Sequence, residues 1–425
     1  MNQYRLAGKK LLILGANPET AGLVLAANSL GIYTIVTDYK QGSYAKRYAW
    51  RQFDVDAADP DAVEKLARTE QVDGVLVGVA EALIPVYHEV CRRLGMPCYA
   101  SKEQFDILTS KDQFKQLCKQ YDIPVVYEYN IDEKQNISYP VVIKPVDSSS
   151  SKGISICRDE VEYIAGIKKA LENSKSKRLL IEKYMTGEEV VIYYSIQDGN
   201  SVLTAMCDRY TNKEQEGVAQ LPVAYIYPSR YLKRYMCTTD EKVQAMFRGL
   251  GLKNGSMFIQ SFIEEGEVRF YEPGYRLNGA QEQVIVSRLS GIDAQKMLIH
   301  FALTGNYGPE NIKLLARPNI SKFACKLSPL VRPGKISKIT GLEEISKMDE
   351  VIDIKPSYDP GDTVDGLGTL RQIICRFYII TDTIEHMTVV INKVYDLLQV
   401  KDDMDQNMML TPFNTSLLGV YKTDV

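Results

Sequence analysis

The chain has 425 residues, with 51 lysines and arginines against 54 aspartates and glutamates, a formal net charge of −3 and 45% hydrophobic residues. This length predicts several domains with enough chain to bury a sizeable core. The near balance of charge argues against a nucleic-acid or membrane-surface binder, because both depend on a positive excess or a dense Lys/Arg patch, and the sequence has neither.

The first hundred residues alternate short β-rich runs with helical runs. Strands are expected at 11–14, 33–37 and 75–79, and a helix at 18–30. Such alternation predicts a parallel sheet covered on both faces. The first apolar run is too short for a signal peptide or a membrane span, so no membrane association is expected.

The turn after the first strand offers an anion site, since Asn17 suits a helix N-cap and Pro18 the first helical position. The turn lacks the GxGxxG glycines of dinucleotide binders, and Asp38 is either a ribose-binding acid or a turn residue. Glu81 follows a buried-looking strand, at the sheet edge where open α/β folds bind ligands. An exposed glutamate at a helix start explains it equally well.

Eight scattered cysteines have no CxxC spacing, so they indicate reduced thiols of a cytoplasmic protein that mostly fill the core. Three histidines, His88, His300 and His386, lie far apart in sequence, which argues against a histidine triad or zinc site. The chemistry therefore rests on lysine, arginine, glutamate and backbone groups.

From residue 101 the pattern changes. Expected elements of the middle region are a helix at 101–121, strands at 139–145, 179–182 and 190–196, a turn at 198–200, and a hairpin of strands 257–264 and 267–272. After residue 309, strands are expected at 335–340 and 372–380, followed by a helix at about 383–398.

Four features of the middle region occur in a fixed order. They are Lys111; Lys144 at the end of an apolar strand, followed by a serine-rich loop; the segment from Glu182 to Glu189; and a hairpin with Gln260 on one strand and Glu272 and Arg276 on the other. Each feature alone is weak evidence for membership of any protein family. The ordered set of four is strong evidence.

Their order and spacing resemble the ATP-grasp superfamily. The resemblance looks closest to the carboxylate-amine ligase branch, with biotin carboxylase, the carbamoyl-phosphate synthetase large chain, phosphoribosylglycinamide-handling enzymes and L-amino acid ligases. It implies an α/β (α+β overall) ATP-grasp fold and is compatible with a homodimer. The implied parts are a Rossmann-like pre-ATP-grasp domain at 1–108, an ATP-grasp domain at 109–315 with a lid lobe at about 122–184, and a structural C-terminal α+β subdomain at 316–425.

The resemblance assigns the ATP phosphates to Lys111 and Lys144, whose point charges suit a polyanion. The loop would close over the phosphates as a lid through its hydroxyls and backbone amides. A solvated lysine and a plain surface loop are the ordinary alternatives. The implied lid residues are Ser148, Ser149, Ser150, Ser151 and Gly153.

The adenine would lie against Glu182, Lys183 and Tyr184, and Glu189 would accept the ribose hydroxyls. Glu188 competes for the ribose, but the seven-residue spacing from Glu182 favours Glu189. A solvated hairpin edge is the alternative for the whole segment.

The resemblance also implies Mg²⁺, or Mn²⁺, held by Gln260 and Glu272. Gly274 stands where an asparagine is expected, so either a water replaces that ligand or a second metal is weakened, with Asn278 as a candidate substitute. Arg276 is retained where a guanidinium holds the transferring oxygens.

The resulting hypothesis is an ATP-dependent ligase that joins a small-molecule carboxylate to an amine through an acyl phosphate, releasing ADP and phosphate. Two alternatives remain, a purine-pathway ligase that acts on a ribonucleotide amine and a non-catalytic ATP-binding protein with a degenerate metal site. Candidate substrate residues are Asn17, Glu81, Arg209 and Arg230.

Overall fold

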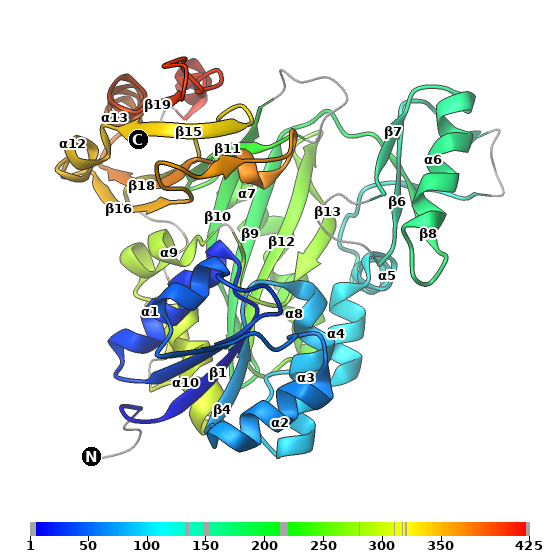
Figure 1. The fold of residues 1–425 in the computed structure, drawn as a ribbon. Coiled ribbons are helices and arrows are strands. Elements are labelled where there is room, and N and C mark those ends of the chain that lie inside the picture. The colour runs from blue at the N-terminus through cyan, green and yellow to red at the C-terminus, as the bar shows by residue number, and fades with distance from the viewer. Residues whose placement is uncertain are drawn as a thin grey trace.

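The computed structural model describes residues 6–131, 136–147, 153–212, 220–279, 281–309, 311–316, 318 and 321–421. The described chain contains four β-sheets with helices packed around them (Figure 1). A broad central sheet joins an N-terminal layer, a small outlying lobe and a C-terminal layer, which gives the mixed α/β architecture expected from the sequence.

The N-terminal layer is a parallel sheet of strand order β3-β2-β1-β4. Leu11, Leu12, Ile13 and Leu14 are completely buried, because both faces of the sheet are covered. The helix expected at 18–30 begins as a short 3-10 turn. The elements are β1 (Lys10–Leu14), η1 (Pro18–Thr20), α1 (Ala21–Ser29), β2 (Tyr33–Thr37), η2 (Tyr44–Tyr48), β3 (Arg51–Phe53), α2 (Pro60–Glu70), β4 (Gly74–Val77), η3 (Glu81–Leu83) and α3 (Ile84–Leu94).

The helix expected at 101–121 is two helices, α4 (Lys102–Thr109) and α5 (Lys111–Gln120). They are separated by Ser110, which adopts an extended conformation with φ −101° and ψ 114°. The break makes Lys111 the first residue of α5. The other helices of the middle region are α7 (Leu232–Thr238), α8 (Asp240–Gly249), α9 (Gln283–Ser290), α10 (Ala294–Thr304) and α11 (Ile312–Leu315).

The small lobe carries an antiparallel sheet of order β5-β8-β6-β7 and stands apart from the central sheet (Figure 1). Its helix α6 (Glu160–Glu172) packs on the sheet around a core of Ile143, Tyr163 and Ile181. The strands are β5 (Glu128–Tyr129), β6 (Val141–Pro145), β7 (Ser155–Cys157) and β8 (Leu179–Lys183).

The central sheet has eight antiparallel strands in the order β13-β12-β9-β10-β11-β14-β18-β16. Strands from both sides of residue 315 share it, and the domain boundaries at 108/109 and 315/316 stay predictions. The strands are β9 (Glu189–Gln197), β10 (Asn200–Thr211), β11 (Pro222–Tyr227), β12 (Gly255–Glu264), β13 (Glu267–Gly274), β14 (Phe323–Leu327), β16 (Val351–Pro356) and β18 (Cys375–Thr381).

The C-terminal layer adds a three-stranded sheet of order β17-β15-β19. Helix α13 (Ile384–Leu397) packs on β14 and β18 through Met387, Ile391 and Val394, which are fully buried. The remaining elements are β15 (Gly334–Thr340), α12 (Leu342–Ser346), β17 (Thr363–Val364), η5 (Leu370–Gln372), β19 (Gln399–Asp402) and η6 (Thr415–Val420).

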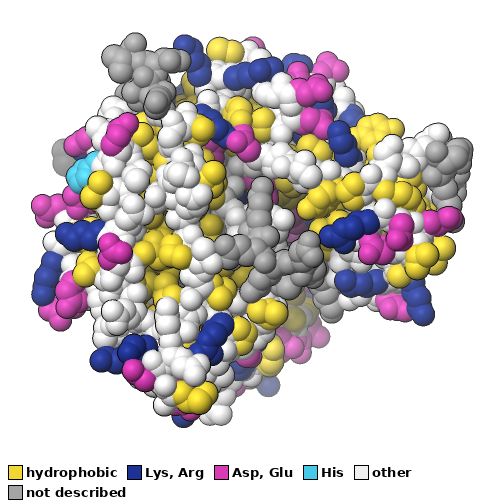
Figure 2. All heavy atoms as spheres, turned by 90° about the horizontal axis from the view of Figure 1, so that it is seen from above, with side chains coloured by type: hydrophobic (Ala, Val, Ile, Leu, Met, Phe, Trp, Pro, Cys, Tyr) yellow, Lys and Arg dark blue, Asp and Glu magenta, His cyan; other side chains and the backbone are white. Residues whose placement is uncertain are grey.

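Three sequence expectations concern the surface and the cysteines. All eight cysteines are free thiols, and six of them are buried. Within the described residues, no helix combines the length and apolarity that crossing a bilayer requires. On the face seen in Figure 2, basic and acidic side chains are interspersed among the described residues rather than gathered into a patch of one sign.

Candidate active site

Two lysines meet one carboxylate between α5 and the small lobe. Lys144 Nζ, from β6, lies 2.7 Å from Glu182 Oε2, and Lys115 Nζ, from α5, donates a hydrogen bond to Glu182 Oε1. Lys115 also lies 3.2 Å from Glu128 Oε1. All three members of the trio, Lys115, Lys144 and Glu182, are buried.

The shared carboxylate fixes the charge states of this trio. Burial disfavours the carboxylate form of Glu182, but Lys144 and Lys115 outweigh burial and lower its pKa. Burial lowers the pKa of Lys144, although Glu182, which Lys144 shares with Lys115, opposes the shift. Glu182 is therefore held as an anion between two cations, and its assignment to the adenine amine stays a prediction.

The second predicted phosphate lysine meets the predicted metal acid. Lys111 Nζ lies 3.1 Å from Glu272 Oε1. Burial opposes both charges, yet Glu272 raises the pKa of Lys111, while Lys111 and Lys144 lower that of Glu272. The N-terminal end of α5 and strand β13 thus bring together two residues 161 positions apart in sequence.

Gln260 and Glu272 face each other as cross-strand partners on β12 and β13. Tyr271 Oη donates a hydrogen bond to Gln260 Oε1 at 2.6 Å and lies 3.4 Å from Glu189 Oε2. The Lys144 ammonium lies 5.6 Å from the centre of the Tyr271 ring. Tyr271 therefore contacts residues predicted to bind the phosphates, the metal and the ribose, and sequence reasoning missed this link.

Gln260 and Glu272 suit a cation that arrives with a nucleotide. Mg²⁺ is commonly bound through one or two protein oxygens, with phosphates and waters completing the coordination. The carboxylate of Glu272 and the amide oxygen of Gln260, on neighbouring strands, are two protein oxygens of this kind. Among the described residues, no group of three or more His, Cys, Asp or Glu side chains is arranged to hold a metal without such help.

The missing asparagine has a steric explanation. A Cβ atom added at Gly274 would lie 2.1 Å from Cζ of Phe258, a buried ring on β12. The guanidinium of Arg276 lies 5.1 Å from the centre of the same ring. Phe258 thus occupies the space that a side chain at residue 274 would need. Substitution by Asn278 stays a prediction.

Arg276 contacts the N-terminal layer directly. Its Nε donates to Glu81 Oε2 at 3.3 Å, and its Nη1 donates to the Leu277 carbonyl at 3.0 Å. Burial raises the pKa of Glu81, although Arg276 opposes the shift. The Tyr99 hydroxyl donates to the Tyr275 carbonyl at 3.0 Å beside this contact. The contact therefore brings Arg276, which follows β13, against Glu81 of the N-terminal layer, and both are predicted site residues.

The predicted substrate arginines are both engaged. Arg209 forms an ion pair with Glu189, the predicted ribose acid. Arg230 pairs with Glu188, and its Nε lies 3.5 Å from Asp208 Oδ2. Neither guanidinium is without a carboxylate partner.

Other predicted residues lie around this centre. Lys183 Nζ donates to Glu264 Oε1 at 2.5 Å, and the Tyr184 amide donates to the Pro140 carbonyl at 3.3 Å. Asn17 accepts a hydrogen bond from the Thr20 hydroxyl at the start of η1. Gly153 has φ +80°, a conformation that favours glycine. Ser148, Ser149, Ser150 and Ser151 lie outside the described residues.

Lys115 was also missed, although the sequence carries a usable signal. It follows Lys111 by four residues, and that spacing puts two side chains on the same face of a helix. The lysine pair therefore points from α5 toward the same cluster of carboxylates.

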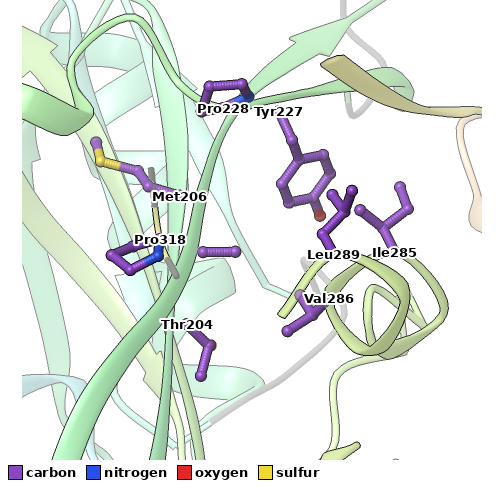
Figure 3. Close-up of a pocket in the computed structure, with 9 residues that line it drawn as sticks. Thr204, Met206, Tyr227, Pro228, Ile285, Val286, Leu289 and Pro318 are labelled. Carbon is purple, nitrogen blue, oxygen red and sulfur yellow. The ribbon is translucent and has the colours of Figure 1, made fainter. Parts of the chain in front are cut away.

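A small apolar pocket lies on the central sheet, beside α9 (Figure 3). The Tyr227 ring points from β11 toward Ile285 and Leu289 of α9 in this view. The pocket contains none of the ion pairs above, and its contacts hold α9 against the sheet. It is lined by Thr204, Ala205, Met206, Tyr227, Pro228, Ile285, Val286, Leu289 and Pro318.

Parts of this chain are similar to known proteins. Residues 137–279 match the ATP-grasp domain family. The chain is 24% identical over 367 residues to the formate-dependent phosphoribosylglycinamide formyltransferase of Haloquadratum walsbyi, covering 83% of this chain and 87% of that protein. It is 24% identical over 219 residues to the enzyme of the same name from Bacillus subtilis, covering 49% of this chain and 56% of that relative's length.

Among solved structures, the L-amino acid ligase from Bacillus licheniformis superposes with a TM-score of 0.76 at 18% identity, covering 93% of this chain and 99% of that one. This likeness and the family match confirm the fold that the motifs implied. The match to the Bacillus subtilis enzyme spans little more than half of that protein.

Proposed function

Because residues 137–279 match the ATP-grasp domain family, we propose that this chain is an ATP-dependent ligase that joins a carboxylate to an amine. The observation that carries the proposal is the meeting of Lys111, Lys144, Glu272 and Arg276 from separate elements. Lysines suit the triphosphate, an acid suits its metal, and an arginine suits the transferring group.

The chemistry proceeds in two balanced steps. A carboxylate oxygen of the substrate attacks the γ-phosphorus, the bond to the β-phosphate oxygen breaks, and ADP leaves. The amine nitrogen then attacks the acyl carbon, phosphate leaves with the carbon–oxygen electron pair, and the nitrogen loses one proton. The products are an amide-type bond, ADP and phosphate.

The protein's share of this work is positioning and charge neutralisation. Lys111 and Lys144 bind the phosphates, and Arg276 holds the oxygens of the transferring group. Glu272 and Gln260 would hold Mg²⁺, which offsets phosphate charge when bound. Glu81 keeps the Arg276 guanidinium oriented through their contact.

Steady-state ADP release with pooled carboxylates and pooled amines tests the proposal. We expect release that depends on both pools, and its loss in Lys144→Ala and Glu272→Ala. Lys119→Ala is the matched control, because Lys119 lies on α5 and is half exposed. ATP binding without ADP release from any pool would instead support a non-catalytic nucleotide-binding protein.

A purine-pathway reaction is the second candidate. It is favoured by the two formyltransferase relatives, whose name specifies formate and a phosphoribosylglycinamide. The turn around Asn17 would take the ribonucleotide phosphate, and Glu81 would orient its amine. ADP release that requires both formate and glycinamide ribonucleotide would establish this candidate, whereas release with other acids and amines only would exclude it.

A further inference from the structure

One row of cross-strand neighbours crosses five strands of the central sheet. In order, its members are Glu189, Arg209, Tyr225, Lys326 and Tyr378 on β9, β10, β11, β14 and β18. Residues directly opposite each other point to the same face of a sheet. Lys326 therefore shares a face with the predicted ribose acid, three strand spacings or about 14 Å away along the sheet.

Lys326 is the cation of this face that lacks an anion. It is 2% exposed, and its ammonium lies 3.7 Å from the centre of the Tyr225 ring. No hydrogen bond or ion pair joins this ammonium to another described residue. By contrast, Arg209 pairs with Glu189, and Arg376 Nη2 donates to Glu19 Oε1 at 2.8 Å. The charged form of a buried lysine is costly without an anionic partner, and a bound anion would offset that cost.

Further buried polar atoms nearby lack partners. Nε of Arg209, Nε of Arg376 and Oε2 of Glu282 are buried without a hydrogen-bond partner among the described residues. Helix α9 starts directly after Glu282 and is held to the sheet by its apolar side chains (Figure 3). The two arginine Nε–H groups are unsatisfied donors that an anionic acceptor would satisfy.

The protonation states agree with this geometry. Burial raises the pKa of Glu282 to about 8, so at neutral pH this acid is mostly protonated and supplies little negative charge. Burial first, and Arg376 second, lower the pKa of Lys326 to about 7. Burial disfavours the charged form of Arg209, but Glu189 outweighs burial and raises its pKa. Around Lys326, this face of the central sheet therefore carries little negative charge of its own.

We propose that Lys326, with the free Nε–H groups of Arg209 and Arg376, forms a binding site for an anionic group of the acid substrate, a carboxylate or a phosphate. The proposal rests on the proposed ligase function. Ammonium and guanidinium donors are the groups that bind such oxygens most strongly. Lys326 thereby supplies the ammonium of the site, whereas Arg209 and Arg230 already have carboxylate partners.

Equilibrium dialysis with radiolabelled acetate, and separately with inorganic phosphate, tests the site without ATP. We expect Lys326→Met to raise the Kd of at least one probe tenfold or more, and Lys326→Arg to stay within threefold of the parent. Lys322→Met is the matched control, because Lys322 precedes the same strand and is half exposed. If Lys326→Met does not fold, Lys326→Gln replaces it.

The two probes separate the two sources of charge. Loss confined to acetate identifies a carboxylate, and loss confined to phosphate identifies a phosphate. Absence of binding by the parent, or equal binding by the parent and Lys326→Met, overturns the proposal. Phosphate binding that Lys144→Met removes and Lys326→Met keeps belongs to the nucleotide site and counts against it.

Failure of the ligase function has a different signature. ADP release would then be absent with every substrate pool, while anion binding would still depend on Lys326. Conversely, if the protein is an active ligase but Lys326→Met leaves the Kd of both anions unchanged, only the Lys326 site is refuted.

Discussion

The carboxylate of Glu182 lies 2.7 Å from the ammonium of Lys144, and both groups are almost completely buried. Breaking a buried pair of this kind leaves an uncompensated charge, which typically costs about 3–5 kcal/mol. A third group, Lys115, binds the same carboxylate. The trio therefore contributes to stability, whatever its part in the proposed phosphate site.

We expect Lys115→Met to lower the free energy of unfolding by about 2 kcal/mol, because Glu182 then keeps only one of its two cationic partners. Lys119→Met, one turn later on α5, should stay within about 0.5 kcal/mol, since Lys119 is half exposed. Urea unfolding of the two variants measures the difference. Equal effects would show that the buried carboxylate does not depend on Lys115.

Gly274→Asn should destabilise the protein by about 1–3 kcal/mol, because the new side chain collides with the Phe258 ring. Adding Phe258→Ala should relieve part of that cost, so the double variant should be more stable than the sum of the single changes predicts. Thermal unfolding of all three variants measures this coupling. Strict additivity would show that the ring does not exclude the asparagine.

Arg276→Lys should reduce kcat by about a hundredfold, because an ammonium cannot reproduce the planar contacts of the guanidinium with Glu81 and the transferring group. Its unfolding temperature should change little. The matched control is Arg288→Lys on the exposed side of α9. ADP-release kinetics of both variants provide the comparison, and equal kcat values for them would remove Arg276 from the site.

Asp208 should make stability depend on pH. Burial raises the pKa of this carboxyl to about 6, although hydrogen bonds from Ser229 and Tyr421 oppose the shift. Its stabilising contribution is therefore complete below the unfolded pKa of about 3.9 and is lost as the pH rises through 6. Between pH 4 and 7 this loss amounts to about 2 kcal/mol.

The variant Asp208→Asn cannot titrate at this position. We expect its free energy of unfolding to lack that decline, so the difference between the parent and the variant should change across pH 4 to 7. Denaturant titrations at four pH values measure it. A constant difference would show that Asp208 keeps an ordinary pKa in the folded protein.

Linear motifs predicted several of the residues that the structure brings close together, while their roles stay predictions. Lys144 and Glu272 each belong to a short run whose order along the chain is distinctive, and the hairpin register places Gln260 opposite Glu272. Tyr271 and Lys326 were not predictable in the same way. Their roles depend on which strands become neighbours, and strand order in a sheet is not written in the local spacing of residues.

The secondary structure was also predictable only in part. Strands with strong apolar runs and the hairpin turn at 198–200 lie where they were expected. The break at Ser110 was missed, because the flanking residues favour a helix on both sides and no proline or glycine marks the interruption. That break matters, since it makes Lys111 the first residue of α5.

The pairing of β11 with β14 makes the last hundred residues part of one cooperative unit. Ala224 to Tyr227 bond to Ala324 to Leu327, so a chain ending at residue 315 would leave the outer edge of β11 with a row of unpaired amide and carbonyl groups. An exposed edge of that kind recruits other chains and promotes aggregation. Residues 316–425 therefore cannot be removed as a separate domain. Their removal would disrupt the same sheet that carries Glu189 and Arg209.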